Sequence, residues 1–169
     1  MTRKWQGKFI EVHEAAYGSG QWEYVTRVQN IGAAVILALT DAGEIVLVEQ
    51  YRIPLAARTI ELPAGLIGDD GTAEAAHTAA ARELEEETGW RAAHWENLGD
   101  FATSPGMSSE MFTLFRARGL TRTGPGGGID GEDIRPHLVA VADLPRFLAE
   151  KRAAGMVIDC RLGLALGLV

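Results

Sequence analysis

The sequence predicts an α+β domain in which a mixed β-sheet lies between helices, and three observations support this prediction. Strand patterns fill most of the first half of the chain, one strongly helical segment lies near the middle, and helical patterns close the chain. With 169 residues, of which 47% are hydrophobic, the chain is long enough for one well-packed domain and too short to suggest two. We therefore expect residues 1–169 to form a single domain.

The strands expected in the first half are defined by alternating or β-branched apolar residues and by the turns between them. A Gly-Ser-Gly turn at residues 18–20 separates the first two strands, and Thr-Asp-Ala-Gly at residues 40–43 has the composition of a hairpin loop. The expected strands cover residues 8–17, 21–30, 33–39, 44–49 and 59–62.

The second half begins with a helix expected over residues 73–88, with Thr72 as its N-cap and Gly89 just past its end. Further strands are expected at residues 94–102, 111–117 and 136–141, and further helices at residues 146–154 and 158–168. The glycine-rich run at residues 124–128 is the only low-complexity stretch, and we expect it to be a mobile loop.

The helix expected at residues 73–88 carries a cluster of carboxylates at its end. Glu83, Glu86 and Glu87 stand at i, i+3 and i+4, so they share one helix face. Repulsion at ~4 Å costs about 1 kcal/mol per pair in bulk water and about 4 kcal/mol near a protein surface, and the helix dipole adds roughly 0.3–1 kcal/mol. Such a run is often only a solvated helix face. A bound cation would also explain it, and carboxylate oxygens select Mg²⁺, Mn²⁺ or Ca²⁺ over zinc.

The residues around this cluster favour the metal site. Arg82 can reach Glu86 one turn later and hold its carboxylate. Residues 68–90 resemble the Nudix box, Gly-x5-Glu-x7-Arg-Glu-U-x-Glu-Glu-x-Gly-U, in which U is a bulky apolar residue. The residues that match are Gly68, Glu74, Arg82, Glu83, Leu84, Glu86, Glu87 and Gly89. Trp90 departs from the usual aliphatic residue at the last position but keeps its bulk. The resemblance implies the Nudix αβα sandwich.

Composition indicates which classes of partner and which cellular compartment to expect. A net charge of −7 argues against a nucleic-acid-binding surface, which needs a basic stripe. Cys160 is the only cysteine, so no intramolecular disulfide can form and a reducing compartment is expected. The first twelve residues lack the apolar stretch of a signal peptide, and the longest apolar run, residues 31–39, is too short to span a bilayer. We expect a cytoplasmic protein without membrane or nucleic-acid partners.

Four further segments resemble one branch of the Nudix family when taken together, although each alone could be a strand exit, a surface ion pair or an ordinary loop. They are Gln-Tyr-Arg at residues 50–52, Glu-Leu-Pro-Ala-Gly at 61–65, Ser-Pro-Gly at 104–106, and the glycine-rich loop that ends in Glu-Asp-Ile at 132–134. The branch contains the ADP-ribose pyrophosphatases and their nucleoside-diphosphate-sugar relatives, including GDP-mannose hydrolases. Pro105 favours ADP-ribose, whereas the acidic triple-glycine loop is equally like the GDP-mannose group.

The resemblance implies metal-dependent hydrolysis of a pyrophosphate, which releases a nucleoside monophosphate and a sugar phosphate. Mg²⁺, with Mn²⁺ as the alternative, is the implied cofactor, and a small nucleotide sugar is the implied substrate. The implied metal ligands are Glu83, Glu86, Glu87 and the carbonyl of Ala64, with Arg82 orienting the carboxylates. The implied general base is Glu132, with Asp130 as the alternative, and the implied substrate contacts are Arg52, Glu61 and Glu110.

Two other functions remain open. The chain could hydrolyse oxidised nucleoside triphosphates, although it lacks the further motifs of that group, or it could be a non-catalytic sensor of nucleotide sugars. Sensors of this kind typically lose box glutamates, and this sequence keeps them all. The resemblance also implies a homodimer in which the N-terminal strands, within residues 1–30, pack or exchange across the interface.

Overall fold

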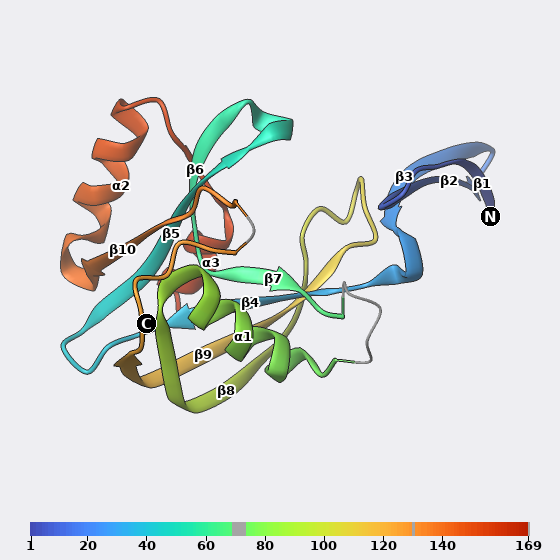
Figure 1. Cartoon of the computed structure of the whole chain (residues 1–169). Coiled ribbons are helices and arrows are strands. Elements are labelled where there is room, and N and C mark those ends of the chain that lie inside the picture. The colour runs from blue at the N-terminus through green and yellow to red at the C-terminus, as the bar shows by residue number, and fades with distance from the viewer. Residues whose placement is uncertain (69–73, 130, 169) are drawn as a thin grey trace.

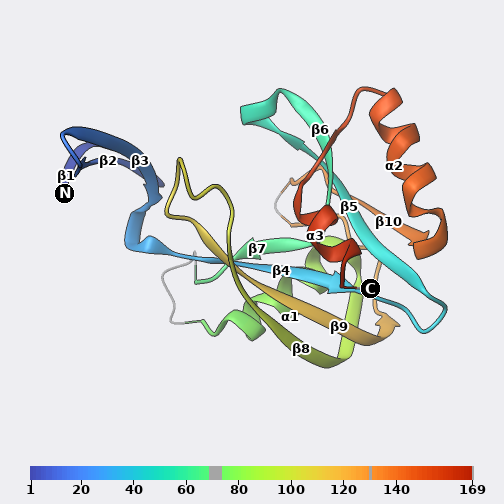
Figure 2. The same cartoon turned by 180° about the vertical axis from the view of Figure 1, so that it is seen from behind.

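The computed structural model describes residues 1–68, 74–129 and 131–168, and within these ranges it contains three β-sheets and three α-helices (Figure 1). Two four-stranded sheets form the body. Helix α1 lies on one side of the body and helices α2 and α3 lie on the other, whereas a three-stranded N-terminal sheet projects away (Figures 1 and 2). The expected α+β class, with mixed sheets between helices, is confirmed.

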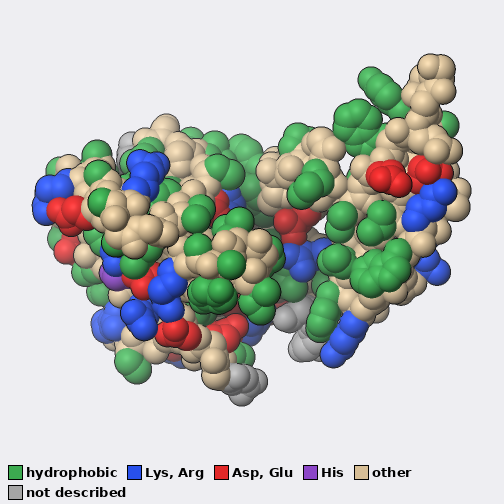
Figure 3. All heavy atoms as spheres, turned by 90° about the horizontal axis from the view of Figure 1, so that it is seen from above, with side chains coloured by type: hydrophobic (Ala, Val, Ile, Leu, Met, Phe, Trp, Pro, Cys, Tyr) green, Lys and Arg blue, Asp and Glu red, His purple; other side chains and the backbone are tan. Residues whose placement is uncertain are grey.

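The projecting sheet consists of β1 (Thr2–Gln6), β2 (Ile10–Tyr17) and β3 (Gly20–Arg27), all antiparallel. Strand β1 was not expected from the sequence. No residue in the range 1–33 is fully buried, and hydrophobic side chains gather on this projecting part of the molecule (Figure 3). The large exposed ones are Met1, Trp5, Phe9, Ile10, Tyr17 and Trp22. The sheet joins the body through Val25, which exchanges backbone hydrogen bonds with residues 107 and 109.

One body sheet has the strand order β10-β5-β6-β11. Strand β5 (Glu44–Arg52) pairs antiparallel with β10 (Arg135–Ala140) and with β6 (Ala57–Glu61). Strand β11 (Val157–Ile158) then pairs parallel with β6. This short strand lies within a segment in which we expected the terminal helix to begin.

The other body sheet has the order β7-β4-β9-β8. Strand β4 (Ala33–Ala38) pairs antiparallel with β7 (Ala64–Leu66) and parallel with β9 (Met111–Arg122), which in turn pairs with β8 (Trp90–Ala102). Strand β7 was not expected. Strands β8 and β9 are longer than expected because they form one long antiparallel ladder from Trp90 paired with Arg122 to Ala102 paired with Met111.

Strand β4 supplies the two halves of the hydrophobic core. Successive side chains of a strand point to opposite faces, so Ala34 and Ile36 pack toward Leu84 of α1, whereas Val35 and Leu37 pack toward α2 and α3. All four β4 residues are fully buried. A continuous apolar strand of this kind is typical of a sheet covered on both faces.

The helices differ from the sequence expectations at their starts. Helix α1 (Ala76–Thr88) begins three residues later than expected, with Ala75 at its N-cap, and Thr72 lies outside the described residues. Its end is as expected, because Gly89 adopts φ 70° and its N–H donates to the Glu85 carbonyl. Helix α2 (Leu144–Ala153) closely matches its prediction. Among the described helices, none has the length and apolar character to cross a membrane.

Helix α3 (Arg161–Leu166) is shorter than the predicted helix at residues 158–168, which was wrong at its start. Asp159 explains the difference: its N–H donates to the carbonyl of Ile60, which keeps the chain on β6, and its carboxylate accepts from the N–H of Arg161 at 2.7 Å.

The glycine-rich run at residues 124–128 is not the free loop that we expected. The N–H groups of Gly127 and Gly128 donate to the carbonyls of Glu87 and Glu86 at 2.9 and 3.0 Å, so the run is tied to the last turn of α1. A Cβ atom at Gly126 would lie 2.4 Å from the Thr88 backbone. Glycine is therefore required there by close backbone contact.

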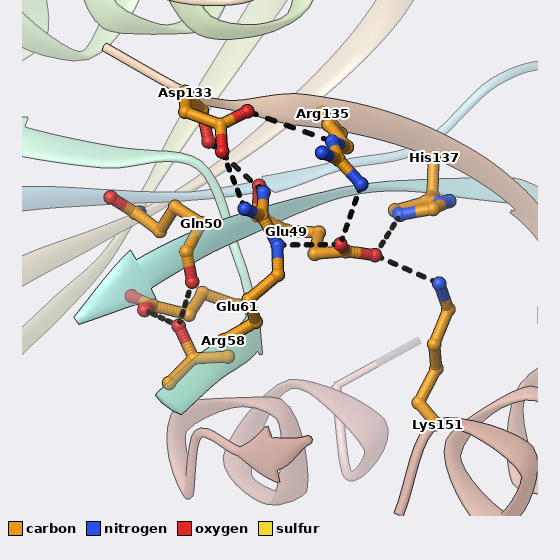
Figure 4. Close-up of polar contacts among 9 residues, drawn as sticks. Glu49, Gln50, Arg58, Glu61, Asp133, Arg135, His137 and Lys151 are labelled. Carbon is orange, nitrogen blue, oxygen red and sulfur yellow. Dashed lines mark hydrogen bonds and ion pairs between the residues drawn. The ribbon is translucent and has the colours of Figure 1, made fainter. Parts of the chain in front are cut away.

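Glu49 joins four elements of the body through one buried carboxylate (Figure 4). Located on β5, it accepts hydrogen bonds from Arg58 of β6 at 2.7 Å, His137 of β10 at 3.1 Å and Lys151 of α2 at 2.8 Å. Burial alone would raise the pKa of Glu49, but the hydrogen bonds from Lys151, His137 and Arg58 outweigh it and lower the pKa to about 2.

The lowered pKa predicts an acid-sensitive contribution to stability. The Glu49 contribution should be complete above the ordinary pKa of 4.5 and lost as the pH falls from there toward 2. A shift of this size corresponds to about 3 kcal/mol. Glu49→Gln should therefore lower the free energy of unfolding at pH 7 and flatten its pH dependence between 4.5 and 2, as measured by urea unfolding. Glu150→Gln, which removes only an exposed ion pair, is the control. Parallel curves for wild type and Glu49→Gln would contradict this account.

Candidate active site

A cleft of about 1010 Å³ opens where the body sheets, the end of α1 and the projecting sheet meet. Seen from above, the molecule is hollowed between the projecting sheet and the body (Figure 3). Most of the site residues expected from the sequence line this cleft, and Arg27, Asp159 and Arg161 join them. The expected residues that line it are Arg52, Glu61, Ala64, Glu83, Glu87, Glu110 and Glu132.

Helix α1 presents Glu83 and Glu87 to the cleft from the edge of its buried face. Leu84 and Ala80 are fully buried against the body, and Glu83 and Glu87 lie beside them around the helix, next to β7. A Cβ atom at Gly65 of β7 would lie 1.9 Å from the Glu83 carboxylate. A larger residue at this position would displace that carboxylate from where it lies.

Arg82 holds the glutamates that do not bond to β7. Its Nη1 donates to Glu83 at 2.8 Å and to Glu86 at 3.1 Å, and its Nη2 donates to Glu74 at 3.3 Å. The hydrogen bond to Glu74 is the largest cause that raises the pKa of Arg82. The expected contact between Arg82 and Glu86 is present, and Arg82 and Glu86 lie beside the cleft rather than on its lining.

Glu87 is the most buried of the acidic residues on α1, with 4% of its surface exposed. Its carboxylate accepts the N–H of Ala64 at 3.0 Å. Burial raises the pKa of Glu87 to about 8; the hydrogen bond from Ala64 lowers it in part, and the charges of Glu83 and Glu132 raise it further. The folded chain therefore places an acid that is difficult to ionise on the lining of the cleft.

Two other glutamates are buried as deeply as Glu87, and both have cationic partners. Glu49 has Arg58 and Lys151, and Glu61 has Arg52 and Arg161. Glu87 makes no ion pair with any described residue. Glu87 is therefore the one member of this set that lacks an ion-pair partner among the described residues, although the charge of Arg52 lowers its pKa in part. Buried charges are normally paired or bound to a metal.

Glu61 organises the opposite wall of the cleft. Its carboxylate accepts two hydrogen bonds from Arg52, both at 2.7 Å, one from Arg161 at 3.1 Å, and one from Thr59. Arg161 is held in turn by Asp159, at 2.9 and 3.0 Å from its Nε. Sequence reasoning missed Asp159 and Arg161 because they lie about a hundred positions from Glu61, within a segment that we expected to be helical.

Glu132 lies on the cleft beside the glutamates of α1. Its Oε2 atom accepts the N–H of Ile129 at 3.1 Å. Its charge is close enough to raise the pKa of Glu83 and Glu87, in both of which burial is the largest cause. Asp130, the alternative base, lies outside the described residues. Glu110 lines the cleft elsewhere and pairs with Arg27 of β3 at 2.6 Å.

Comparison with known families agrees with this geometry. The family model described as the NUDIX domain matches residues 29–160. The chain belongs to the NUDIX domain family. The match includes the acidic helix, Arg52, Glu61 and Glu132, whereas Arg161 and the whole projecting sheet lie outside it.

Three relatives indicate which NUDIX proteins this chain is similar to. The chain is 35% identical over 146 residues to the methanol dehydrogenase activator of Bacillus methanolicus, covering 85% of this chain and 76% of the relative. It is 45% identical over 102 residues to the ADP-ribose pyrophosphatase of Mycobacterium tuberculosis, covering 59% of this chain and only 48% of the relative. It is 32% identical over 175 residues to the GDP-mannose pyrophosphatase of Cronobacter sakazakii, covering 98% and 81%.

A solved structure supports the fold. The crystal structure described as an ADP compounds hydrolase superposes with a TM-score of 0.66 at 22% identity, covering 86% of this chain and 80% of that one. Together these findings confirm the NUDIX fold and the expected resemblance to the ADP-ribose and nucleotide-sugar branch.

NUDIX hydrolases generally use divalent metal ions, and the residues of the cleft suit such an ion. Within the described ranges no three acidic, histidine or cysteine side chains converge into a ready-made metal cage, because Arg82 holds Glu83 and Glu86 while Ala64 holds Glu87. The donors are nonetheless hard carboxylate oxygens, and Glu87 lacks a cation. A divalent ion bound by Glu83, Glu86 and Glu87 would supply that missing charge.

The buried acid predicts a pH-dependent effect of metal on stability. Metal binds the ionised carboxylate, and the Glu87 pKa of about 8 means that binding at lower pH must release a proton. Mg²⁺ should therefore raise the Tm more at pH 8 than at pH 6, by linkage of binding to folding. Glu87→Gln should abolish the shift and the activity, whereas Glu85→Gln, on the exposed side of α1, should keep both. A full Mg²⁺ shift in Glu87→Gln would exclude Glu87 as a ligand.

Proposed function

We propose that this NUDIX protein hydrolyses the pyrophosphate of a nucleoside diphosphate linked to a sugar, with ADP-ribose as its preferred substrate, and releases a nucleoside monophosphate and a sugar phosphate. The observation that carries the proposal is that acidic residues of α1 and a pair of arginines line the same cleft. Glu87, without a cation, lies on one wall, and the arginine pair Arg52 and Arg161 lies on the other. A pyrophosphate needs both a metal and positive side chains to neutralise its charge.

The metal that we propose is Mg²⁺, with Mn²⁺ as an alternative. Glu83, Glu86, Glu87 and the Ala64 carbonyl would hold it, and Arg82 would orient the carboxylates when no metal is bound. A bound divalent ion neutralises the pyrophosphate oxygens and raises the acidity of the attacking water.

Arg52 is the proposed phosphate contact. Two of its nitrogens, Nε and Nη2, are occupied by Glu61, which fixes the plane of the guanidinium at the cleft. Its Nη1 has no hydrogen-bond partner among the described residues and is available to a phosphate oxygen. Glu61, predicted as a direct substrate contact, acts in this proposal through Arg52, because Arg52, Arg161 and Thr59 already occupy its carboxylate. Glu110 remains a proposed contact for the nucleoside or the sugar.

The proposed general base is Glu132, which would take a proton from the attacking water. Among the described acidic residues outside helix α1, Glu132 is the one that lines the cleft and whose charge raises the pKa of both Glu83 and Glu87. It therefore lies near the proposed metal ligands, as a general base should.

We also propose that the protein is a cytoplasmic homodimer assembled through the projecting sheet, residues 1–27. The sheet exposes Trp5, Phe9 and Trp22, and a solvent-exposed apolar patch of this kind is typical of an interface. Its contact with the body, through Arg27 and Glu110, brings any partner on the sheet close to the cleft. Light scattering should give twice the chain mass, and a monomer at micromolar concentration would exclude this assembly.

Removing the base should affect turnover and spare metal binding. Glu132→Gln should lower kcat about 10²–10⁴-fold, the usual range for a general base, with the Mg²⁺-dependent rise in Tm unchanged. Steady-state kinetics with ADP-ribose test this. Asp130→Asn is the comparison, and if it causes the greater loss while Glu132→Gln is nearly harmless, the two roles are reversed.

The substrate is tested by a panel. ADP-ribose should have the highest kcat/KM, with GDP-mannose next and UDP-glucose also turned over, because the pyrophosphate rather than the base makes the charged contacts in this proposal. A nucleoside triphosphate preferred by tenfold or more, about 1.4 kcal/mol of transition-state binding, would instead favour a triphosphate hydrolase. If the protein binds ADP-ribose tightly but does not hydrolyse it, the non-catalytic sensor is favoured.

A further inference from the structure

Arg58 connects Asp133, the residue that follows Glu132 in the chain, to the buried carboxylate of Glu49 (Figure 4). The guanidinium of Arg58, on β6, donates from Nη1 to the Asp133 carboxylate at 2.5 Å and from Nη2 to the Asp133 carbonyl at 3.1 Å. Its Nε donates to Glu49 at 2.7 Å. One side chain therefore holds both the side chain and the backbone of the residue next to Glu132.

Arg58 is itself fixed in place. Its partner Glu49 is 2% exposed and is also bonded by Lys151 and His137, so the carboxylate cannot turn away from β6. Arg58 bonds Glu49 from Nε and Asp133 from Nη1, so two separate nitrogens of one rigid plane serve the two carboxylates. A lysine would have to serve both from one nitrogen at the end of a flexible chain. The sheet thus offers the loop a rigid point of attachment.

The loop has a second attachment before Glu132. The N–H groups of Gly127 and Gly128 donate to the carbonyls of Glu87 and Glu86, the residues proposed to bind metal. Glu132 therefore lies between a point fixed on α1 and a point fixed on β6. With both points held, the Glu132 carboxylate remains on the cleft beside Glu83 and Glu87.

We propose that Arg58 and Asp133 are positioning residues that hold Glu132 in place for catalysis. The inference rests on the proposed role of Glu132 as the general base. Asp133 has a side chain that is 62% exposed, and exposed ion pairs contribute little to global stability. The contact is therefore expected to act on turnover rather than on folding, because small displacements of a catalytic group can reduce the rate about 10²-fold.

The test compares ADP-ribose hydrolysis with Mg²⁺ by the full chain and five variants, which include Glu132→Gln and its double variant with Asp133→Ala. Asp133→Ala and Arg58→Lys should each lower kcat about 10- to 100-fold, with KM and the Mg²⁺-dependent shift in Tm close to wild type. The Tm itself should stay close to wild type in Asp133→Ala. In the Glu132→Gln background, Asp133→Ala should cause no further loss, because the group that it positions is gone. Asp143→Ala, which removes an equally exposed aspartate from its pair with Arg146, should leave kcat unchanged.

The outcomes separate this inference from the proposed function. If wild type does not hydrolyse nucleotide sugars, the proposed function fails and the inference fails with it. If wild type and Glu132→Gln behave as proposed but Asp133→Ala keeps its kcat, only the positioning role is overturned. An equal loss from Asp133→Ala with and without Glu132 would also overturn it. Should Arg58→Lys lower the Tm through Glu49, the exposed Asp133→Ala variant still decides the matter.

Discussion

Negative charge is concentrated where helix α1 ends, and much of the structure serves to accommodate it. Three carboxylates and the negative end of a helix dipole meet at this point. Arg82 neutralises the two outer carboxylates, whereas Glu87 is buried against β7 and, among the described residues, accepts a hydrogen bond only from the N–H of Ala64. The glycine at position 65 lets strand and helix approach closely. A cation that enters from the cleft would complete this arrangement.

The two buried carboxylates of the other body sheet, on β5 and β6, have cationic partners. Strand β5 alternates between two faces, so Glu49 points to the side of α2 while Arg52 points to the cleft and meets Glu61 of β6. Both buried glutamates receive arginine or lysine partners. Because carboxylates with cationic partners lie on both sides of this sheet, the lack of an ion-pair partner at Glu87 among the described residues is specific to the site rather than a general property of an acidic protein.

The end of α1 and the loop before Glu132 are built as one unit. Gly89 ends the helix with a positive φ, and a Cβ atom there would lie 2.1 Å from the Gly124 carbonyl oxygen. The glycines that follow then bond to the last helix turn. Close packing of backbone on backbone, which only glycine permits, therefore places Glu132 near glutamates that are some forty-five positions away in the sequence.

The sequence by itself determined the features that depend on neighbouring residues. They are the common helix face of Glu83, Glu86 and Glu87, the contact of Arg82 with Glu86, the end of the helix at Gly89 and most of the strands. These features depend on periods of 2 and 3.6 and on contacts within one helix turn. Tertiary structure alone decided the partners of Glu49 and Glu61, the strand at residues 157–158 and the attachment of the glycine loop. Those contacts join residues up to about a hundred positions apart, so they depend on strand register and chain closure, which no local pattern encodes.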